Sequence, residues 1–188
     1  MTKTLLTCLL AAGAVTAHAE SATYAIDPTH TFVTFEANHM GTSTLRGRFD
    51  KKEGSVTLDK AGKSGKADIT IDATSIDTGV AALDTHLKSK DFFNAAEFGT
   101  AKFSADKFAF NGDKVSEVVG TLTLLGKTQP VTLKASNFNC YINPMLKREV
   151  CGGDFETVFA RSAFGITHSL PFVSDRVRVL IQIEATRP

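Results

Sequence analysis

The stretch "RVRVLIQIE", residues 176–184, decides the fold class because apolar and polar side chains alternate along it. Successive side chains of a β-strand point to opposite faces of a sheet, so residues two apart share a face. One face would carry Val177, Val179, Ile181 and Ile183, and the other Arg176, Arg178, Gln182 and Glu184. The pattern predicts an antiparallel strand with its branched aliphatic face turned inward.

The same alternation recurs upstream. It places Val33, Phe35, Ala37 and His39 on one face of a strand, Leu45, Gly47 and Phe49 on a second, and Ile69, Ile71 and Ala73 on a third. Further strands are expected near residues 54–59, 100–110, 114–125, 130–138 and 154–166. Residues 80–89 differ, because Leu83 and Leu87 share a helical face there. The sequence therefore predicts an all-β fold, a closed antiparallel barrel of about eight strands with one short helix over about residues 80–90.

The N-terminal segment has the layout of a secretory signal peptide. Lys3 is followed by an apolar run from Leu5 to Val15, and Ala17 and Ala19 stand before the expected cleavage site. That run is too short for a membrane-spanning helix, which needs about 20 apolar residues. We expect residues 1–19 to be removed on export and residues 20–188 to form a single domain.

Two cysteines remain beyond the signal segment, Cys140 and Cys151, eleven positions apart. In an oxidising compartment such a pair most simply forms one disulfide. A redox pair and half of a metal site are the alternatives, although redox pairs usually stand two residues apart at the start of a helix. The intervening polar and glycine-containing piece, Asn143 to Asp154, is expected to be a long surface loop fastened at its base by this disulfide.

Charge and motifs argue against several function classes. The chain carries 21 Lys and Arg against 20 Asp and Glu, interspersed along its length, whereas nucleic acids and anionic membranes attract clustered basic residues. The histidines His30, His39, His86 and His168 show no metal-ligand spacing, and the chain contains no GxSxG, GxGxxG or GxxxxGK[ST]. We therefore predict no catalytic residue, no metal site and no nucleotide cofactor. If the protein were an enzyme, His39 is the one histidine that strand parity makes a plausible interior acid or base.

The aromatic composition is unusual, with 14 Phe against two Tyr and no Trp. Phe offers a large apolar face without a polar group, which suits either a hydrocarbon guest or an ordinary aromatic core. Arg161 shares its strand parity with Phe155 and Phe159, so its side chain is expected to point inward. A buried guanidinium needs a partner, either a ligand headgroup or groups of the protein itself, in which case Arg161 is structural.

Several short motifs occur in order between Tyr24 and Glu184. They are Tyr24 to Asp27 followed by His30, Phe35 to His39, Gly47 to Phe49, Ser75 to Thr78, "DTHLKSKDFF" from Asp84 to Phe93, Phe103-Ser104, Gly120 to Thr123, Gly126 with Val131, and Phe159 to Arg161 running into Phe164 to Ile166. Together they resemble the YceI-like family, periplasmic polyisoprenoid-binding proteins with a lipocalin-like barrel. The resemblance covers almost the whole chain after the signal segment.

The resemblance implies an extended eight-stranded barrel in the periplasm of a Gram-negative bacterium. Its apolar tunnel would hold an isoprenoid lipid, either ubiquinone, a quinone precursor or another polyprenyl compound, as ligand and not as a cofactor of catalysis. Binding of a fatty acid or fatty amide is the alternative, and an enzyme acting on such a lipid is a further one. Transient contact with a membrane or membrane protein is compatible with such a carrier, and both a monomer and a homodimer are left open.

Strand parity and the resemblance together predict a set of ligand-binding residues. Phe92 and Phe93 are placed near one opening by the resemblance alone, and His39 or Arg161 is expected near a headgroup. The full set is Val33, Phe35, Ala37, His39, Leu45, Phe49, Ile69, Ile71, Phe92, Phe93, Phe103, Leu122, Arg161 and Phe164.

Overall fold

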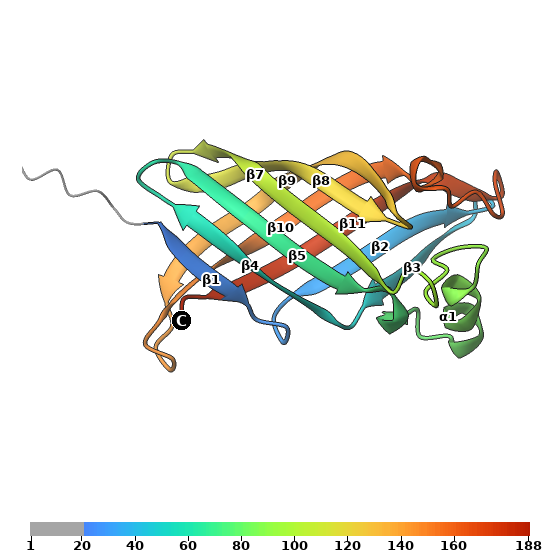
Figure 1. Cartoon of the computed structure of the whole chain (residues 1–188), viewed down its shortest axis with the longest axis horizontal. Helices are drawn as coiled ribbons and strands as arrows, with labels where there is room; N and C mark the ends of the chain where they lie inside the picture. The colour runs from blue at the N-terminus through green and yellow to red at the C-terminus, as the bar shows by residue number, and fades with distance from the viewer. Residues whose placement is uncertain (1–20) are drawn as a thin grey trace, which may run out of the picture.

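The computed structural model describes residues 21–188, which form a barrel of antiparallel strands with one short α-helix (Figure 1). The predicted signal peptide lies outside the described residues. The strands are β1 (Ala22–Ile26), β2 (Phe32–His39), β3 (Ser43–Phe49), β4 (Lys52–Asp59), β5 (Ser64–Asp72), β6 (Ile76–Asp77), β7 (Thr100–Asn111), β8 (Lys114–Leu124), β9 (Lys127–Ile142), β10 (Glu149–Ala160) and β11 (Val173–Thr186). The helices are α1 (Ala81–Lys88) and the short 3₁₀ turns η1 (Ala73–Ser75) and η2 (Arg161–Phe164).

Eight strands close into a ring in the order β1, β4, β5, β7, β8, β9, β10, β11. The ring closes where Ala25 and Ile26 of β1 pair with Thr186 and Ala185 of β11. The earlier part of β11 pairs with β2, and β3 and β6 extend the sheet from there. The predicted all-β class, the eight-stranded antiparallel barrel and the short helix near residues 80–90 are thus confirmed. The sequence did not indicate β6 as a strand, because it is only two residues long.

The register of β11 sets which side chains face the barrel interior. Val179 lies opposite Thr157 of β10 and Phe35 of β2, and Ile181 lies opposite Phe155 and Val33. The four aliphatic residues predicted to point inward all line the interior cavity. On the outer face, Arg178 pairs with Glu36 and Glu156. The four inward side chains are partly accessible and not fully buried, because they face a cavity and not a filled core.

A glycine makes room for one of the inward aromatic rings. Gly47 of β3 lies opposite Phe35 of β2, and a Cβ atom at Gly47 would lie 2.4 Å from the ring of Phe35. Any other residue here would displace the ring from the position that it occupies against the barrel wall. The period-two pattern of β3 therefore includes a small residue where the barrel interior needs space.

Two predicted boundaries are wrong. The strand expected over residues 154–166 ends at Ala160, where the chain enters η2 and then turns at Gly165 with φ of 92°. The second half of the long loop expected from Asn143 to Asp154 is strand, since β10 begins at Glu149. Its Gly152-Gly153 pair looked like a turn signal, but a Cβ at either position would lie within 2.3 Å of a backbone oxygen on a neighbouring strand. These glycines allow close packing of strands.

The predicted disulfide is present and joins Cys140 to Cys151. The two residues are direct cross-strand partners on β9 and β10, so the bond links paired strands and does not close a long loop at its base. Cys151 belongs to the main hydrophobic cluster of the barrel, and Cys140 packs against it. Within the described part of the chain, no helix is long and apolar enough to cross a membrane.

The register of β11 can be tested by placing a charge on each of its faces. Val179→Lys puts an ammonium group into the apolar interior and should lower the free energy of unfolding by about 2 kcal/mol or more. Gln182→Lys, on the exposed face opposite Asp154, should change it by no more than about 0.5 kcal/mol. Urea unfolding of both variants measures the difference, and equal effects at the two positions would contradict the register.

Replacing both Cys140 and Cys151 with serine should lower the free energy of unfolding by roughly 3 kcal/mol, because the unfolded chain would no longer be cross-linked. The control is thiol titration of the denatured, unmutated protein without residues 1–19, which should detect no free thiol. Two free thiols in protein isolated from an oxidising compartment would show that the bond is not formed there.

Candidate functional site

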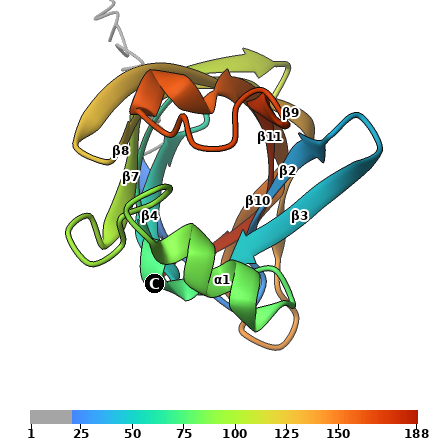
Figure 2. The same ribbon diagram turned by 90° about the vertical axis from the view of Figure 1, so that its right-hand side faces the viewer.

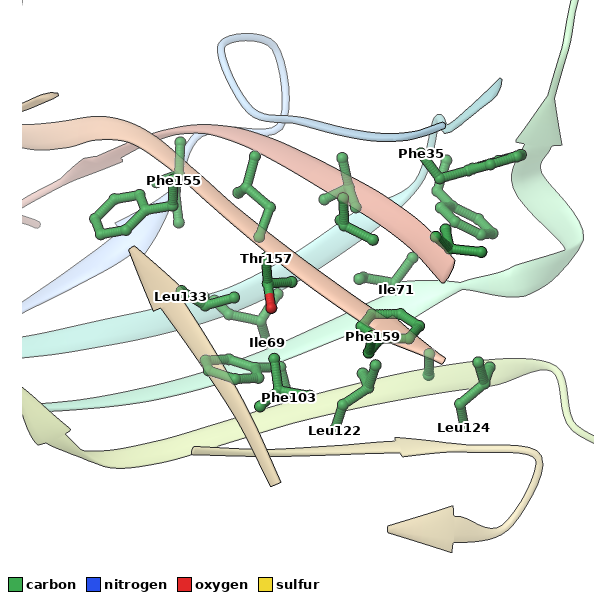
Figure 3. A pocket seen from close by; sticks show the side chains of 18 of the residues that line it. Phe35, Ile69, Ile71, Phe103, Leu122, Leu124, Leu133, Phe155, Thr157 and Phe159 are labelled. Atoms are coloured by element: carbon green, nitrogen blue, oxygen red, sulfur yellow. The ribbon is translucent and has the colours of Figure 1, made fainter. Parts of the chain in front are cut away.

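A cavity of about 440 Å³ occupies the barrel interior, within the range of small-molecule binding sites. Its lining includes residues from the barrel strands, from α1 and from the segment between η2 and β11. Figure 3 shows the side chains of Ile69, Ile71, Phe103, Leu122 and Phe155 converging on this space from several strands. Nearly all of the lining is hydrocarbon, so the site suits an apolar guest.

Thirteen of the fourteen residues predicted from the sequence line the cavity. They are Val33, Phe35, Ala37, His39, Leu45, Phe49, Ile69, Ile71, Phe92, Phe93, Phe103, Leu122 and Arg161. The exception is Phe164, which is buried in a neighbouring cluster with Ala101, Leu124 and Ile166. Its ring centroid lies 5.2 Å from that of Phe159. Strand parity misplaced Phe164 because the strand ends at Ala160, four residues earlier.

The helix α1 lies at one end of the barrel, across from the segment that joins η2 to β11 (Figure 2). Its residues Leu83, His86 and Leu87 contribute to the cavity lining. Asp84 fixes the start of the helix, because its carboxylate accepts hydrogen bonds from Thr78 N (2.7 Å) and Thr78 Oγ1 (2.6 Å). These hydrogen bonds hold the pKa of the Asp84 carboxyl below its usual value. The motif that begins at Asp84 therefore anchors one side of the cavity mouth.

Aromatic rings continue from the mouth into the barrel. The ring of Phe93, just after α1, stands edge-on to Phe49 with 5.5 Å between centroids, and Phe49 lies 5.9 Å from Phe35. Phe92 contacts a second group, with its centroid 4.9 Å from that of His86 and 5.3 Å from that of His168. The two phenylalanines expected near an opening therefore lie beside the mouth, and each packs against different neighbours.

Polar side chains of the lining gather mainly at the mouth. His39 stands at the end of β2 and lines the cavity, as strand parity predicts. His86 also lines it, and its ring centroid lies 5.5 Å from that of His168, which in turn has Nδ1 3.9 Å from Oδ2 of Asp91. Sequence spacing gave no sign of this pair, because the two histidines are far apart in the chain and meet only through the fold.

Arg161 is buried, and its guanidinium donates to four backbone carbonyl oxygens. The acceptors are Ser174 O (2.9 Å), Ile166 O (3.1 Å), His168 O (2.9 Å) and Val173 O (3.0 Å). Burial lowers the pKa of Arg161, and the charge of Asp175 opposes that shift. Asp175 itself accepts from Ser162 N and Ser162 Oγ. The geometry matches the structural alternative for Arg161: the side chain ties together the segment that borders the mouth.

The other end of the cavity is packed shut. Tyr24 lines the cavity there, yet its exposed fraction is 0%. Its hydroxyl donates to Glu149 Oε2 (2.7 Å), and Glu149 also pairs with Lys60. Burial, together with the hydrogen bond to Glu149 and its charge, raises the pKa of Tyr24 to about 12. Among the described residues, the lining is thus fully buried at Tyr24, whereas the lining residue His86 of α1 is exposed, so we take the α1 end as the mouth of the cavity.

The lining offers little for acid–base or metal chemistry. No aspartate or glutamate is among the described residues that line the cavity. The side chains of Cys140, Glu149 and Cys151 place ligand atoms within 4.8 Å of one another, but the two sulfur atoms are joined to each other and offer no thiolate. The arrangement can enclose a hydrocarbon and leave a polar group near the histidines.

The predicted set of ligand-binding residues leaves out part of the lining that strand parity also points inward. Phe155, Thr157 and Phe159 alternate along β10 and all face the cavity (Figure 3). Leu83 and Leu87, on the predicted helical face, also line the cavity and were also left out of the predicted set.

The comparisons with known proteins agree with this architecture. The family model for the YceI-like domain matches residues 24–185. A UPF0312 protein of Pseudomonas aeruginosa is 36% identical over 195 residues, which covers 98% of both chains. Protein YceI of Salmonella arizonae is 35% identical over 175 residues, which covers 92% of this chain and 91% of that protein.

Solved structures share the fold. Burkholderia cenocepacia BcnA superposes with a TM-score of 0.72 at 28% identity, covering 86% of this chain and 99% of that one. A polyisoprenoid binding domain from Saccharophagus degradans superposes with a TM-score of 0.62 at 18% identity, covering 89% of this chain and 99% of that one. With the family match over most of its length and relatives that share a third of its residues, the chain belongs to the YceI-like family.

Proposed function

We propose that the protein is a periplasmic carrier that holds a long-chain isoprenoid lipid in the barrel cavity without transforming it. Ubiquinone, a quinone precursor or another polyprenyl compound is the proposed ligand. The observation that carries this proposal is the distribution of polarity in the tunnel, whose walls are hydrocarbon while His39 and His86 stand toward its open end. An amphiphile with one long apolar tail matches that distribution when its tail enters first.

The energetics favour a tail-first arrangement. Removing apolar surface from water contributes about 25 cal/mol per Å², so an extended hydrocarbon supplies most of the affinity without any directed polar contact. The phenylalanines along the lining present such surface on several sides. A polar headgroup buried at the closed end would meet the hydroxyls of Tyr24 and Thr31, which already donate to Glu149 Oε2 and to Glu184 O. We therefore expect the headgroup at the mouth.

Two further observations support the ligand class and the location. The similar fold of the Saccharophagus degradans domain is that of a polyisoprenoid binding domain, and the two chains overlap along nearly their whole lengths. The N-terminal sequence has the layout of a signal peptide, and the described residues contain a disulfide, which persists in oxidising compartments. Both support a carrier that works outside the cytoplasm.

The lining also bears on the alternative of an enzyme acting on the lipid. General acid–base catalysis requires a donor and an acceptor within hydrogen-bonding distance of the reacting group. Histidines are present at the mouth, but no carboxylate of the described residues lines the cavity to pair with them inside it. This supports the assignment of the protein as a carrier.

Organic extraction of protein purified from its native compartment, followed by mass spectrometry, tests the ligand class directly. We expect a polyprenyl compound that is recovered unchanged after incubation and re-extraction. Recovery of a fatty acid or fatty amide would support the alternative ligand, and conversion of the lipid during incubation would support an enzyme.

Affinity should depend on the tail more than on the ring. In a series of quinones with fewer isoprene units, each unit removed should weaken binding by at least tenfold, because each methylene taken out of water contributes about 0.8 kcal/mol. Changes to the ring substituents should have smaller effects, since few polar groups face them. Isothermal titration calorimetry in dilute detergent measures both series, and a stronger dependence on the ring would contradict tail-first binding.

A charge in the cavity wall should remove the ligand without unfolding the barrel. Phe35 is only partly buried and points into the cavity, so Phe35→Asp should abolish copurification of lipid. Its neighbour Thr34 points to the other face and lies opposite Arg48, so Thr34→Asp is the matched control and should retain lipid. Circular dichroism verifies that both variants fold. Retention of the same lipid by a folded Phe35→Asp variant would place the ligand elsewhere.

A further inference from the structure

Large apolar side chains are exposed together at the tip of the β9–β10 hairpin. The exposed fraction is 65% for Ile142, 86% for Met145 and 53% for Leu146, and Tyr141 beside them is also exposed. Monomeric proteins rarely expose a contiguous apolar group of this kind unless it binds something. The tip, residues 141–148, is separate from the ligand cavity, since none of these residues lines it.

The tip is held in one shape by its own hydrogen bonds. The side-chain oxygen of Asn143 accepts from Met145 N (2.9 Å) and Leu146 N (3.1 Å), and Asn143 N donates to Arg148 O (2.8 Å). The disulfide between Cys140 and Cys151 cross-links the two strands just below. The apolar side chains are therefore displayed on a braced turn and do not fold back onto the barrel.

The charges at the tip are positive. Lys147 and Arg148 are exposed beside the apolar residues. The one acidic residue nearby in sequence, Glu149, is partly buried and neutralised by Lys60, with a further hydrogen bond from Tyr24. The composition of the whole chain does not reveal this local excess of positive charge. Only the fold brings Lys60 to Glu149, so that Glu149 does not neutralise Lys147 and Arg148.

We propose that the hairpin tip inserts into the surface of an anionic lipid bilayer. Ile142, Met145 and Leu146 would enter the boundary between headgroups and acyl chains, while Lys147 and Arg148 would pair with lipid phosphates. A second copy of this chain is a poorer occupant, because tip-to-tip contact would bring the basic residues of both copies together. This surface is independent of the proposed carrier function, because its test requires no ligand in the cavity.

The geometry also sets the orientation on the membrane. The β9–β10 turn, drawn in orange, lies at the end of the barrel opposite α1 (Figure 1). The cavity mouth is at the α1 end, so attachment through the tip leaves the mouth uncovered. Phe172, with an exposed fraction of 62%, lies at that mouth end and serves as a comparison site.

The chain contains no tryptophan, so a single introduced Trp reports on its own surroundings. With vesicles of phosphatidylcholine and phosphatidylglycerol, Met145→Trp should show a blue shift of its fluorescence, and Phe172→Trp should show none. The shift should be absent with pure phosphatidylcholine and should disappear in high salt. A shift at Phe172→Trp but not at Met145→Trp, or equal binding to neutral vesicles, would overturn the proposal.

A charge series provides the second measurement. In vesicle flotation, replacing both Lys147 and Arg148 with glutamine should weaken binding by about thirtyfold, since each basic residue near an anionic surface contributes about a fivefold gain. The matched control replaces Lys102 and Lys107, two exposed lysines of β7, and should change binding by less than threefold. Sedimentation of the free protein completes the test, because self-association lost in the Met145→Trp variant would identify a second copy as the occupant.

Discussion

The structure depends on the pairing of β11 with three other strands. Residues 177–182 pair with β2, residues 176–186 pair with β10, and the last two residues pair with β1 to close the ring. Because the register is fixed from both sides over residues 177–182, one face of β11 must point into the barrel there. A slip by one residue would bring Arg176 and Arg178 inside and expose the aliphatic face. The hydrocarbon interior exists because this single register is enforced.

Polar interactions are concentrated at the ends of the barrel and leave the middle apolar. At the closed end, the hydroxyl of Tyr24 and the ammonium of Lys60 both bind Glu149, so the groups that seal the tunnel satisfy one another. At the mouth, the guanidinium of Arg161 holds four carbonyl oxygens of the segment before β11. A buried polar group that already has its partners cannot bind a ligand at the same time, so the space between the ends is left for hydrocarbon.

The alternation of apolar and polar residues within one strand predicted which of its side chains face the cavity. It placed Val33, Phe35 and Ile69 in the cavity wall because alternation is local and the strand is regular there. It failed at Phe164 because η2 interrupts the alternation, and the preceding residues contain no glycine or proline to signal the break. The contact between His86 and His168 was equally out of reach, since it depends on where α1 and the segment before β11 meet. The sequence shows which side chains share a face of one strand. It does not show which distant segments come into contact at the mouth, because those contacts depend on how the ring of strands closes.

The disulfide connects the cavity to the exposed hairpin tip. Cys151 lines the closed end of the cavity, and Cys140 packs against the same core cluster. β9 ends at Ile142, only two residues beyond Cys140, and the turn that displays Met145 follows directly. The tip is therefore attached rigidly to the barrel axis, and any surface that binds it fixes the direction of the mouth. If the tip rests on a bilayer and the cavity holds an isoprenoid, the lipid enters and leaves on the side away from that bilayer. The two proposals then require a partner that meets the mouth there, since a long apolar tail does not cross water unaided.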